Sequence, residues 1–277
     1  DENIDPILLI LSSDHFIKNI DKFKQSIQKS IELATKENLI IFGIIPKYLA
    51  TGYGYIKSEK MLKTNEFSAN KVEKFIEKPN LENAKFLFKD KKYSWNSGMF
   101  VFRASAIVKE LKKFNPELIQ NCKECILKSK LDLDFLRLDK SSFSKCSDVS
   151  IDIAVFEKTE KAYVLPLDCG WDDIGDWQSL WKISKKDING NSVKGNVLLK
   201  ETKNSFIRSK EKLLVSLGLN DLLIVDTNDA LLVANKNYSQ EIKNIVSILN
   251  KKKFKEAKQH KKIHRPWGYY LSIEENN

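Results

Sequence analysis

Residues 168–177 read DCGWDDIGDW, and this stretch constrains the fold most because it joins a strand pattern to a helix pattern. Before it, KAYVLPL is rich in Val, Leu and Tyr, which favours a strand. After it, Trp177, Leu180 and Trp181 recur at helical spacing, which predicts a helix from near Asp176. In open α/β sheets, ligands bind at the edge where strands end and helices begin. The stretch therefore predicts an α/β sheet with a ligand site at that edge.

Three carboxylates of this stretch, Asp172, Asp173 and Asp176, fall within five positions. For Asp176, the N-cap of the following helix is the preferred interpretation. A cap does not explain Asp172 and Asp173, which precede it. Because Mg²⁺ is typically held by one or two carboxylates together with substrate phosphates, the pair indicates a candidate metal site.

Two apolar runs, at 7–11 and 39–45, predict buried strands of a mostly parallel sheet. The first run is followed by SSDH, which puts Asp14 and His15 at a strand end. Asp14 is either the N-cap of the next helix or a ligand at the sheet edge, and its neighbours do not separate these two roles. Apolar residues at helical spacing predict a helix over 20–33.

Further candidate residues lie in TGYGYIK, VEKFIEKPN and SWNSGMFVFR. Gly54 allows the backbone to approach a ligand or another strand. Lys78 precedes a proline and is expected to be extended, and strand alternation puts Glu77 and Lys78 on opposite faces, which excludes a simple ion pair between them. Asn96 suits the reading of sugar hydroxyls, but ordinary turn chemistry is the preferred interpretation.

The composition changes after Ser184, where DINGNSVKG reads as a linker and short β-like segments follow from 196 to 234. A helix is expected over 238–249. We therefore predict a nucleotide-binding type of α/β domain over 1–186, a small β-rich domain with a C-terminal helix over 187–250, and a basic linker with the start of a further domain over 251–277.

Charge and composition exclude some functions. The net charge is +10, and residues 251–262 hold seven lysines against one glutamate, which we interpret as a solvated linker rather than a polyanion-binding tail. The lysines lack an aromatic stacking platform, so no nucleic-acid partner is expected. No apolar run approaches the roughly 18 residues of a membrane span.

The four cysteines bear on where the protein is located rather than on a metal or redox site. Cys122 and Cys125 form a C-x-x-C without a second pair, so two reduced thiols on one helix face are preferred to a metal or redox site. Sparse cysteine favours a cytoplasmic protein.

With SSDH, TGYGYI, KFIEKP, WNSGMFVF, SIDIAVFEK, GWDDIGDW and LLIVDTNDALLVANK in this order, the chain resembles the bacterial mannose-1-phosphate guanylyltransferases. These proteins are often fused to a mannose-6-phosphate isomerase cupin domain, and RPWGYY resembles the opening of that cupin. The resemblance implies a Rossmann-like nucleotidyltransferase fold, incomplete at its N-terminus, followed by a small left-handed β-helix-like domain.

The resemblance also implies a reaction, in which GTP and mannose 1-phosphate give GDP-mannose and pyrophosphate for nucleotide-sugar and polysaccharide biosynthesis. It makes Asp14 and Asp173 the catalytic carboxylates that bind Mg²⁺, and we expect them at one sheet edge, close enough to share the ion. Asp172 receives no catalytic role, because its position varies in such motifs.

For the sugar phosphate, the resemblance implies that Lys78 is the catalytic cation on the phosphate. Glu77, Asn96 and the backbone of Gly54 are implied to read the mannose, with Asp173 also touching substrate.

The family's glycine-rich GGxGxRLWP loop is absent from the sequence. We therefore expect a fragment that makes little GDP-mannose by itself, with a homodimer or a missing N-terminal or cupin segment as partner. The alternative is a non-catalytic remnant that binds a sugar nucleotide or docks a subunit. Transfer to a different sugar phosphate is disfavoured by the GWDDIGDW and WNSGMF forms.

Overall fold

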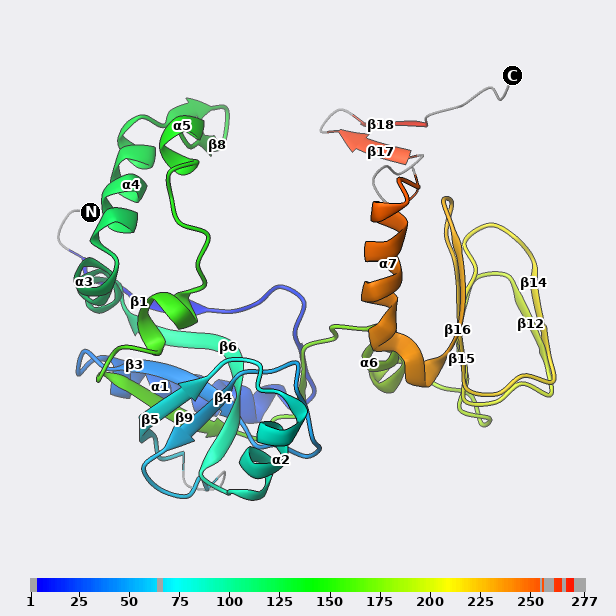
Figure 1. The fold of residues 1–277 in the computed structure, drawn as a ribbon, viewed down its shortest axis with the longest axis horizontal. Coiled ribbons are helices and arrows are strands. Elements are labelled where there is room, and N and C mark those ends of the chain that lie inside the picture. Colours follow the sequence, from blue (N-terminus) through cyan, green and yellow to red (C-terminus); the bar gives the residue numbers. More distant parts are fainter. Residues whose placement is uncertain (1–3, 64–66, 255, 257–261, 266–267, 272–277) are drawn as a thin grey trace. The chain divides into compact units, whose positions relative to one another are not determined.

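The computed structural model describes residues 4–63, 67–254, 256, 262–265 and 268–271. The chain divides into two compact units, residues 1–172 and 173–277, which are described separately (Figure 1). The domain boundaries expected at 186/187 and 250/251 stay predictions. Part of the lysine-rich stretch and part of RPWGYY lie outside the described residues.

The first unit is a central sheet with helices on both faces, and smaller elements at its margins (Figure 1). Its elements in chain order are β1 (Ile7–Ile10), β2 (Phe16–Ile17), α1 (Ile20–Ala34), β3 (Leu39–Ile44), β4 (Tyr55–Ser58), β5 (Asn70–Ile76), α2 (Leu81–Lys89), β6 (Tyr93–Arg103), α3 (Ala104–Phe114), α4 (Pro116–Leu127), β7 (Lys130–Asp132), β8 (Phe135–Arg137), α5 (Lys140–Phe143), the π-helix η1 (Asp152–Phe156), β9 (Ala162–Leu167) and β10 (Trp171–Asp172).

Within the described residues, six strands form the central sheet in the order β1-β6-β3-β9-β5-β4. Strand β3 runs parallel to β9, whereas the other neighbouring pairs are antiparallel. The expected strands at 7–11 and 39–45 are confirmed, but the expectation of a mostly parallel sheet is wrong. The physical reason is the long strand β6, which lies between β1 and β3 and runs against both.

Both faces of the sheet are covered, and all six residues of β3 are buried. On one face, Phe23 and Ala34 of α1 pack against β3, β6 and β9. On the other face, α3 and η1 cover the sheet through residues that include Ile107 and Phe156. At Gly43 the strands approach so closely that a Cβ atom would collide with Ser94 and Val164. The close approach therefore requires glycine at position 43.

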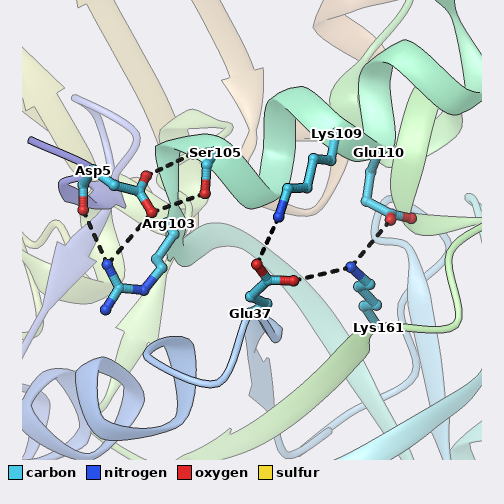
Figure 2. A network of polar contacts seen from close by, with 7 residues as sticks. All are labelled: Asp5, Glu37, Arg103, Ser105, Lys109, Glu110 and Lys161. Atoms are coloured by element: carbon cyan, nitrogen blue, oxygen red, sulfur yellow. Dashed lines mark hydrogen bonds and ion pairs between the residues drawn. The ribbon is translucent and has the colours of Figure 1, made fainter. Parts of the chain in front are cut away.

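A polar network closes the edge at which β1, β3 and β9 begin (Figure 2). Its members are Asp5, Glu37, Arg103, Ser105, Lys109, Glu110 and Lys161. Glu37 is 2.7 Å from the Lys109 ammonium and 3.6 Å from that of Lys161. The hydrogen bond and charge of Lys109 lower the pKa of Glu37. The network joins the end of α1 to α3 and to the start of β9, so it fixes the edge that carries no predicted site residue.

The second unit consists of stacked β-strands with helices packed beside them. Its elements are α6 (Trp177–Ile183), β11 (Ser192–Lys194), β12 (Val197–Lys200), β13 (Phe206–Arg208), β14 (Leu214–Leu217), β15 (Leu222–Asp226), β16 (Leu231–Asn235), the 3-10 helix η2 (Lys236–Glu241), α7 (Ile242–Lys251), β17 (Lys262–Arg265) and β18 (Gly268–Leu271). Parallel pairing of β11 with β13, β13 with β15, and β12 with β14 produces the expected stacked coils. Among the described residues, no helix has the length and apolar character needed to cross a bilayer.

Lys236 ties the coils to α6. Its side chain is buried, with the residue only 5% exposed. The ammonium donates to the Asn204 carbonyl at 2.7 Å, lies 3.3 Å from the Asp221 carboxylate and sits 3.4 Å from the centre of the Trp181 ring. A buried ammonium is tolerated where a carboxylate, a carbonyl and an aromatic face replace its water.

We predict that Lys236→Met destabilises the protein by about 1–3 kcal/mol, because it removes the cation and leaves the Asn204 carbonyl without this donor. Urea unfolding followed by tryptophan fluorescence measures the loss. Lys243→Met, at an exposed position of α7, is the matched control and should unfold like the unaltered protein. Equal midpoints for the two variants would contradict the role given to Lys236.

Candidate functional site

Three strands of the central sheet end at the same edge. Strands β1 and β3 both run against β6, and β9 runs parallel to β3, so the three share one direction. Polar residues follow each of them, namely Asp14 after β1, Lys47 after β3 and Asp168 after β9. Lys47 and Asp168 form an ion pair of 2.8 Å. This is the sheet edge at which the sequence predicts a ligand site.

Asp14 lies in an exposed turn between β1 and β2. The N-cap alternative for Asp14 is wrong, because Asn19 caps α1 and accepts from the backbone N–H of Lys22 at 3.0 Å. Strand β2 pairs with β10, with Phe16 opposite Asp172. The turn that carries Asp14 is thereby attached to the segment that ends the first unit.

Asp173 is the first residue of the second unit, so its separation from Asp14 stays a prediction. The Asp173 carboxylate accepts from the backbone N–H of Gly175 at 3.2 Å. Ile174 between them has a φ of 44°, a left-handed conformation that is costly for a β-branched residue. Strain of this kind is typical of functional sites.

The predicted role of Asp176 is confirmed, since it caps α6. One carboxylate oxygen accepts from the Ser179 N–H at 2.7 Å, and the other accepts from the Ser239 hydroxyl at 3.1 Å.

The structure brings Gly54, Glu77, Lys78 and Asn96 together. The backbone N–H of Asn96 donates to the Gly54 carbonyl at 2.7 Å. A Cβ atom at Gly54 would lie 2.8 Å from Glu77 Oε2, so the glycine leaves room for this carboxylate. Lys78 Nζ lies 3.3 Å from Glu77 Oε1. These residues come from the start of β6, the residue just before β4 and the turn after β5, and they form a polar cluster in the first unit.

Two expectations about Lys78 are wrong. Lys78 is not extended, because its φ is 38°, and it does pair with Glu77. Strand β5 ends at Ile76, so the alternation that separates neighbouring side chains no longer applies at Glu77 and Lys78. The turn overrides the steric preference that Pro79 imposes on the residue before it.

Asn96 lies inside β6, so the expected turn at this place is wrong, but its side chain still makes the local contact to the backbone two residues on that turn chemistry predicts. Its Oδ1 accepts from the backbone N–H of Gly98 at 3.0 Å, and its Nδ2 donates to Asp152 Oδ1 at 3.0 Å.

Asp152 received no role from the sequence. It begins η1 and is half-buried. Burial raises the pKa of the Asp152 carboxyl, the hydrogen bond from Asn96 opposes that rise, and the negative charge of Glu77 adds to it. Asp152 therefore belongs to the same cluster. The sequence feature that could have identified Asp152 is a single carboxylate among the apolar residues Ile151, Ile153, Ala154, Val155 and Phe156.

The chemistry of the predicted metal ligands fits Mg²⁺. Asp14 and Asp173 offer carboxylate oxygens, and Mg²⁺ typically takes one or two of these and completes its shell with water and phosphate. In the described part of the chain, no three His, Cys, Asp or Glu side chains form a group that could hold a metal ion.

In the C-x-x-C of α4, Cys122 is exposed and Cys125 is buried.

Two family models match the chain. Residues 1–190 match the nucleotidyl transferase family, and residues 195–249 match the mannose-phosphate isomerase/GMP-like β-helix domain. The expected fold class, a nucleotidyltransferase domain followed by a β-helix-like domain, is thus confirmed.

Curated relatives resemble nearly the whole chain. A mannose-1-phosphate guanylyltransferase of Salmonella typhimurium, RfbM, is 41% identical over 99% of this chain and 56% of its own length. Mannose-1-phosphate guanylyltransferase 2 of Escherichia coli O157:H7 is 42% identical over 98% of this chain and 57% of its own length. The chain thus spans little more than half the length of these relatives.

Two solved structures are also similar. A structure described as a mannose-1-phosphate geranyltransferase from Thermus thermophilus superposes with a TM-score of 0.75 at 24% identity, over 90% of this chain and 71% of that one. A mannose-6-phosphate isomerase from Helicobacter pylori gives a TM-score of 0.55 at 33% identity, over 61% of this chain and 64% of that one. The first of these supports the fold alone.

We predict that Gly54→Ala displaces the Glu77 carboxylate and weakens, by about tenfold or more, the binding of a small polar probe that this carboxylate contacts, such as a hexose phosphate. The new Cβ would lie 2.8 Å from Glu77 Oε2, the far end of a long side chain, and 3.3 Å from two atoms of the Phe75 ring, so the carboxylate has to move most and the ring by only a few tenths of an ångström. Titration calorimetry measures the affinity, and thermal unfolding should change little. Gly52→Ala is the control, because no atom lies within 4 Å of its Cβ position. Equal affinities of the two variants would contradict this account.

Proposed function

The chain belongs to the nucleotidyl transferase family, and from this premise we propose that it transfers a guanylyl group from GTP to mannose 1-phosphate. The products are GDP-mannose and pyrophosphate. The observation that carries the proposal is the cluster of Gly54, Glu77, Lys78 and Asn96, in which carboxylate, amide and ammonium groups meet. Relatives about 40% identical that carry the name of this activity support the choice of substrates.

In this proposal, the sugar lies over the start of β4 and β6. Glu77 accepts hydrogen bonds from sugar hydroxyls, and the Asn96 amide both donates and accepts. Lys78, whose side chain is 65% exposed, holds the phosphate of the sugar. The ammonium of Lys78 exchanges the Glu77 carboxylate for this phosphate when substrate arrives.

The reaction is a displacement at phosphorus. An oxygen of the sugar phosphate forms a bond to the α-phosphorus of GTP, and the bond to the bridging oxygen of the β-phosphate breaks, which releases pyrophosphate. Lys78 offsets part of the negative charge on the sugar phosphate and holds it in line with the α-phosphorus. Asp14 and Asp173 would hold Mg²⁺, which neutralises charge on the triphosphate. A cytoplasmic location and a homodimer stay predictions.

The test is pyrophosphate release by the full-length protein that contains these residues. We expect release that requires GTP, mannose 1-phosphate and Mg²⁺ together. Asp173→Asn should lower the rate by about 100-fold or more, because the lost charge can no longer hold the ion. No release, or equal release with another nucleoside triphosphate, would contradict the proposal. Tight binding of GDP-mannose without any release would favour the non-catalytic alternative.

Asp176→Ala separates catalysis from stability in the same motif. It should cost about 1 kcal/mol of unfolding free energy through the lost cap, and lower the melting temperature. Below that temperature the rate should stay near that of the unaltered protein. A rate loss as large as that of Asp173→Asn would mean that the Asp176 carboxylate takes part in the reaction.

A further inference from the structure

Asp152 holds one side chain of the proposed sugar site in a fixed orientation. Asn96 Oδ1 faces the backbone N–H of Gly98 at 3.0 Å, and Asn96 Nδ2 faces Asp152 Oδ1 at 3.0 Å. A flipped amide would aim its NH₂ at an N–H and its oxygen at a carboxylate, so both contacts would become repulsive. The amide is therefore fixed, with one Nδ2 proton and one Oδ1 lone pair still available to a ligand.

The position of Asp152 is also unusual for a carboxylate. It begins η1, a π-helical segment whose next buried residues, Ala154, Val155 and Phe156, pack into the core. Short π-helical segments are frequent at functional sites. Core packing behind the carboxylate anchors η1, so Asp152 is presented to Asn96 from a rigid element rather than from a loop.

Asp152 shares its surroundings with a second carboxylate. The burial of Asp152 and the negative charge of Glu77 both raise the pKa of the Asp152 carboxyl. The folded protein is therefore less stable when both carboxylates are ionised than it would be if the two charges did not interact. The ammonium of Lys78 lies 3.3 Å from Glu77 Oε1. Carboxylate oxygens are hydrogen-bond acceptors, so Asp152 and Glu77 suit hydroxyl donors and repel phosphate.

This division of charge orients the ligand. A hexose phosphate has donors on its ring and an anion at one end, so the ring matches Asp152 and Glu77 while the phosphate matches Lys78. We propose that Asp152 is a sugar-recognition residue, which fixes the Asn96 amide with one carboxylate oxygen and accepts a hydrogen bond from a ring hydroxyl with the other. This inference rests on the proposed function and adds to it the residue that distinguishes among the hydroxyls.

The test pairs a protein change with a ligand change. Calorimetric titration compares the full-length protein and its Asp152→Ala variant for mannose 1-phosphate and for monodeoxy analogues that each lack one hydroxyl. We expect Asp152→Ala to bind mannose 1-phosphate about 10–100-fold more weakly, the range for a hydrogen bond to a charged group. One monodeoxy analogue should bind to the unaltered protein and to Asp152→Ala with nearly equal affinity. This analogue is the one that lacks the hydroxyl from which Asp152 accepts a hydrogen bond.

Two further variants complete the experiment. Asp152→Asn keeps the shape and an acceptor for Asn96, so it should fold like the unaltered protein and lose less affinity than Asp152→Ala. Asp148→Ala removes an exposed carboxylate that precedes η1 in the sequence and should leave all affinities unchanged.

Three results would overturn the inference. If Asp152→Ala bound mannose 1-phosphate with unchanged affinity, Asp152 would have no role in sugar recognition. If the variant lost the same affinity for every analogue, Asp152 would have only a structural role. Absence of mannose 1-phosphate binding by the unaltered protein would overturn the inference together with the proposed function, whereas the first two results leave the proposed function standing.

Discussion

The burial of β3 is the constraint on which the first unit depends. All six of its residues are buried, and β6 and β9 pair with its two sides. A strand covered on both faces and both sides cannot present polar side chains along its length, so polar chemistry is confined to its two ends. At the first end the polar groups pair among themselves, as Figure 2 shows for Glu37. At the other end lie Asp14 and the ion pair of Lys47 with Asp168, and this is the end at which the sequence predicts the ligand site.

Much of this arrangement could be predicted from the sequence. Apolar runs identified β1 and β3, and helical spacing identified α1 and the helix after Asp176. Strand direction could not be predicted in the same way, because an apolar run reads alike in parallel and antiparallel neighbours. The direction of the sheet's strands follows from β6, which pairs antiparallel with both β1 and β3, at Phe100 and Val101 with both at once.

The site was predictable where a motif is local and less so where it depends on distant contacts. The cap formed by Asp176 follows from residues next to it. Asn96 and Asp152 are 56 residues apart, and neither motif reveals the hydrogen bond that joins them. Lys78 departs from its expected conformation because a local steric rule describes the dipeptide, whereas the turn after β5 is set by tertiary packing.

The pair formed by Glu77 and Lys78 has a consequence for ionic strength. An isolated surface cation that binds phosphate loses affinity steeply as salt screens the attraction. Lys78 already has a carboxylate 3.3 Å away, so in its proposed role the phosphate replaces one anion by another. Salt weakens the contact that is given up as well as the contact that is formed. The affinity of this lysine for an anionic ligand is therefore buffered against changes in the salt concentration of its surroundings.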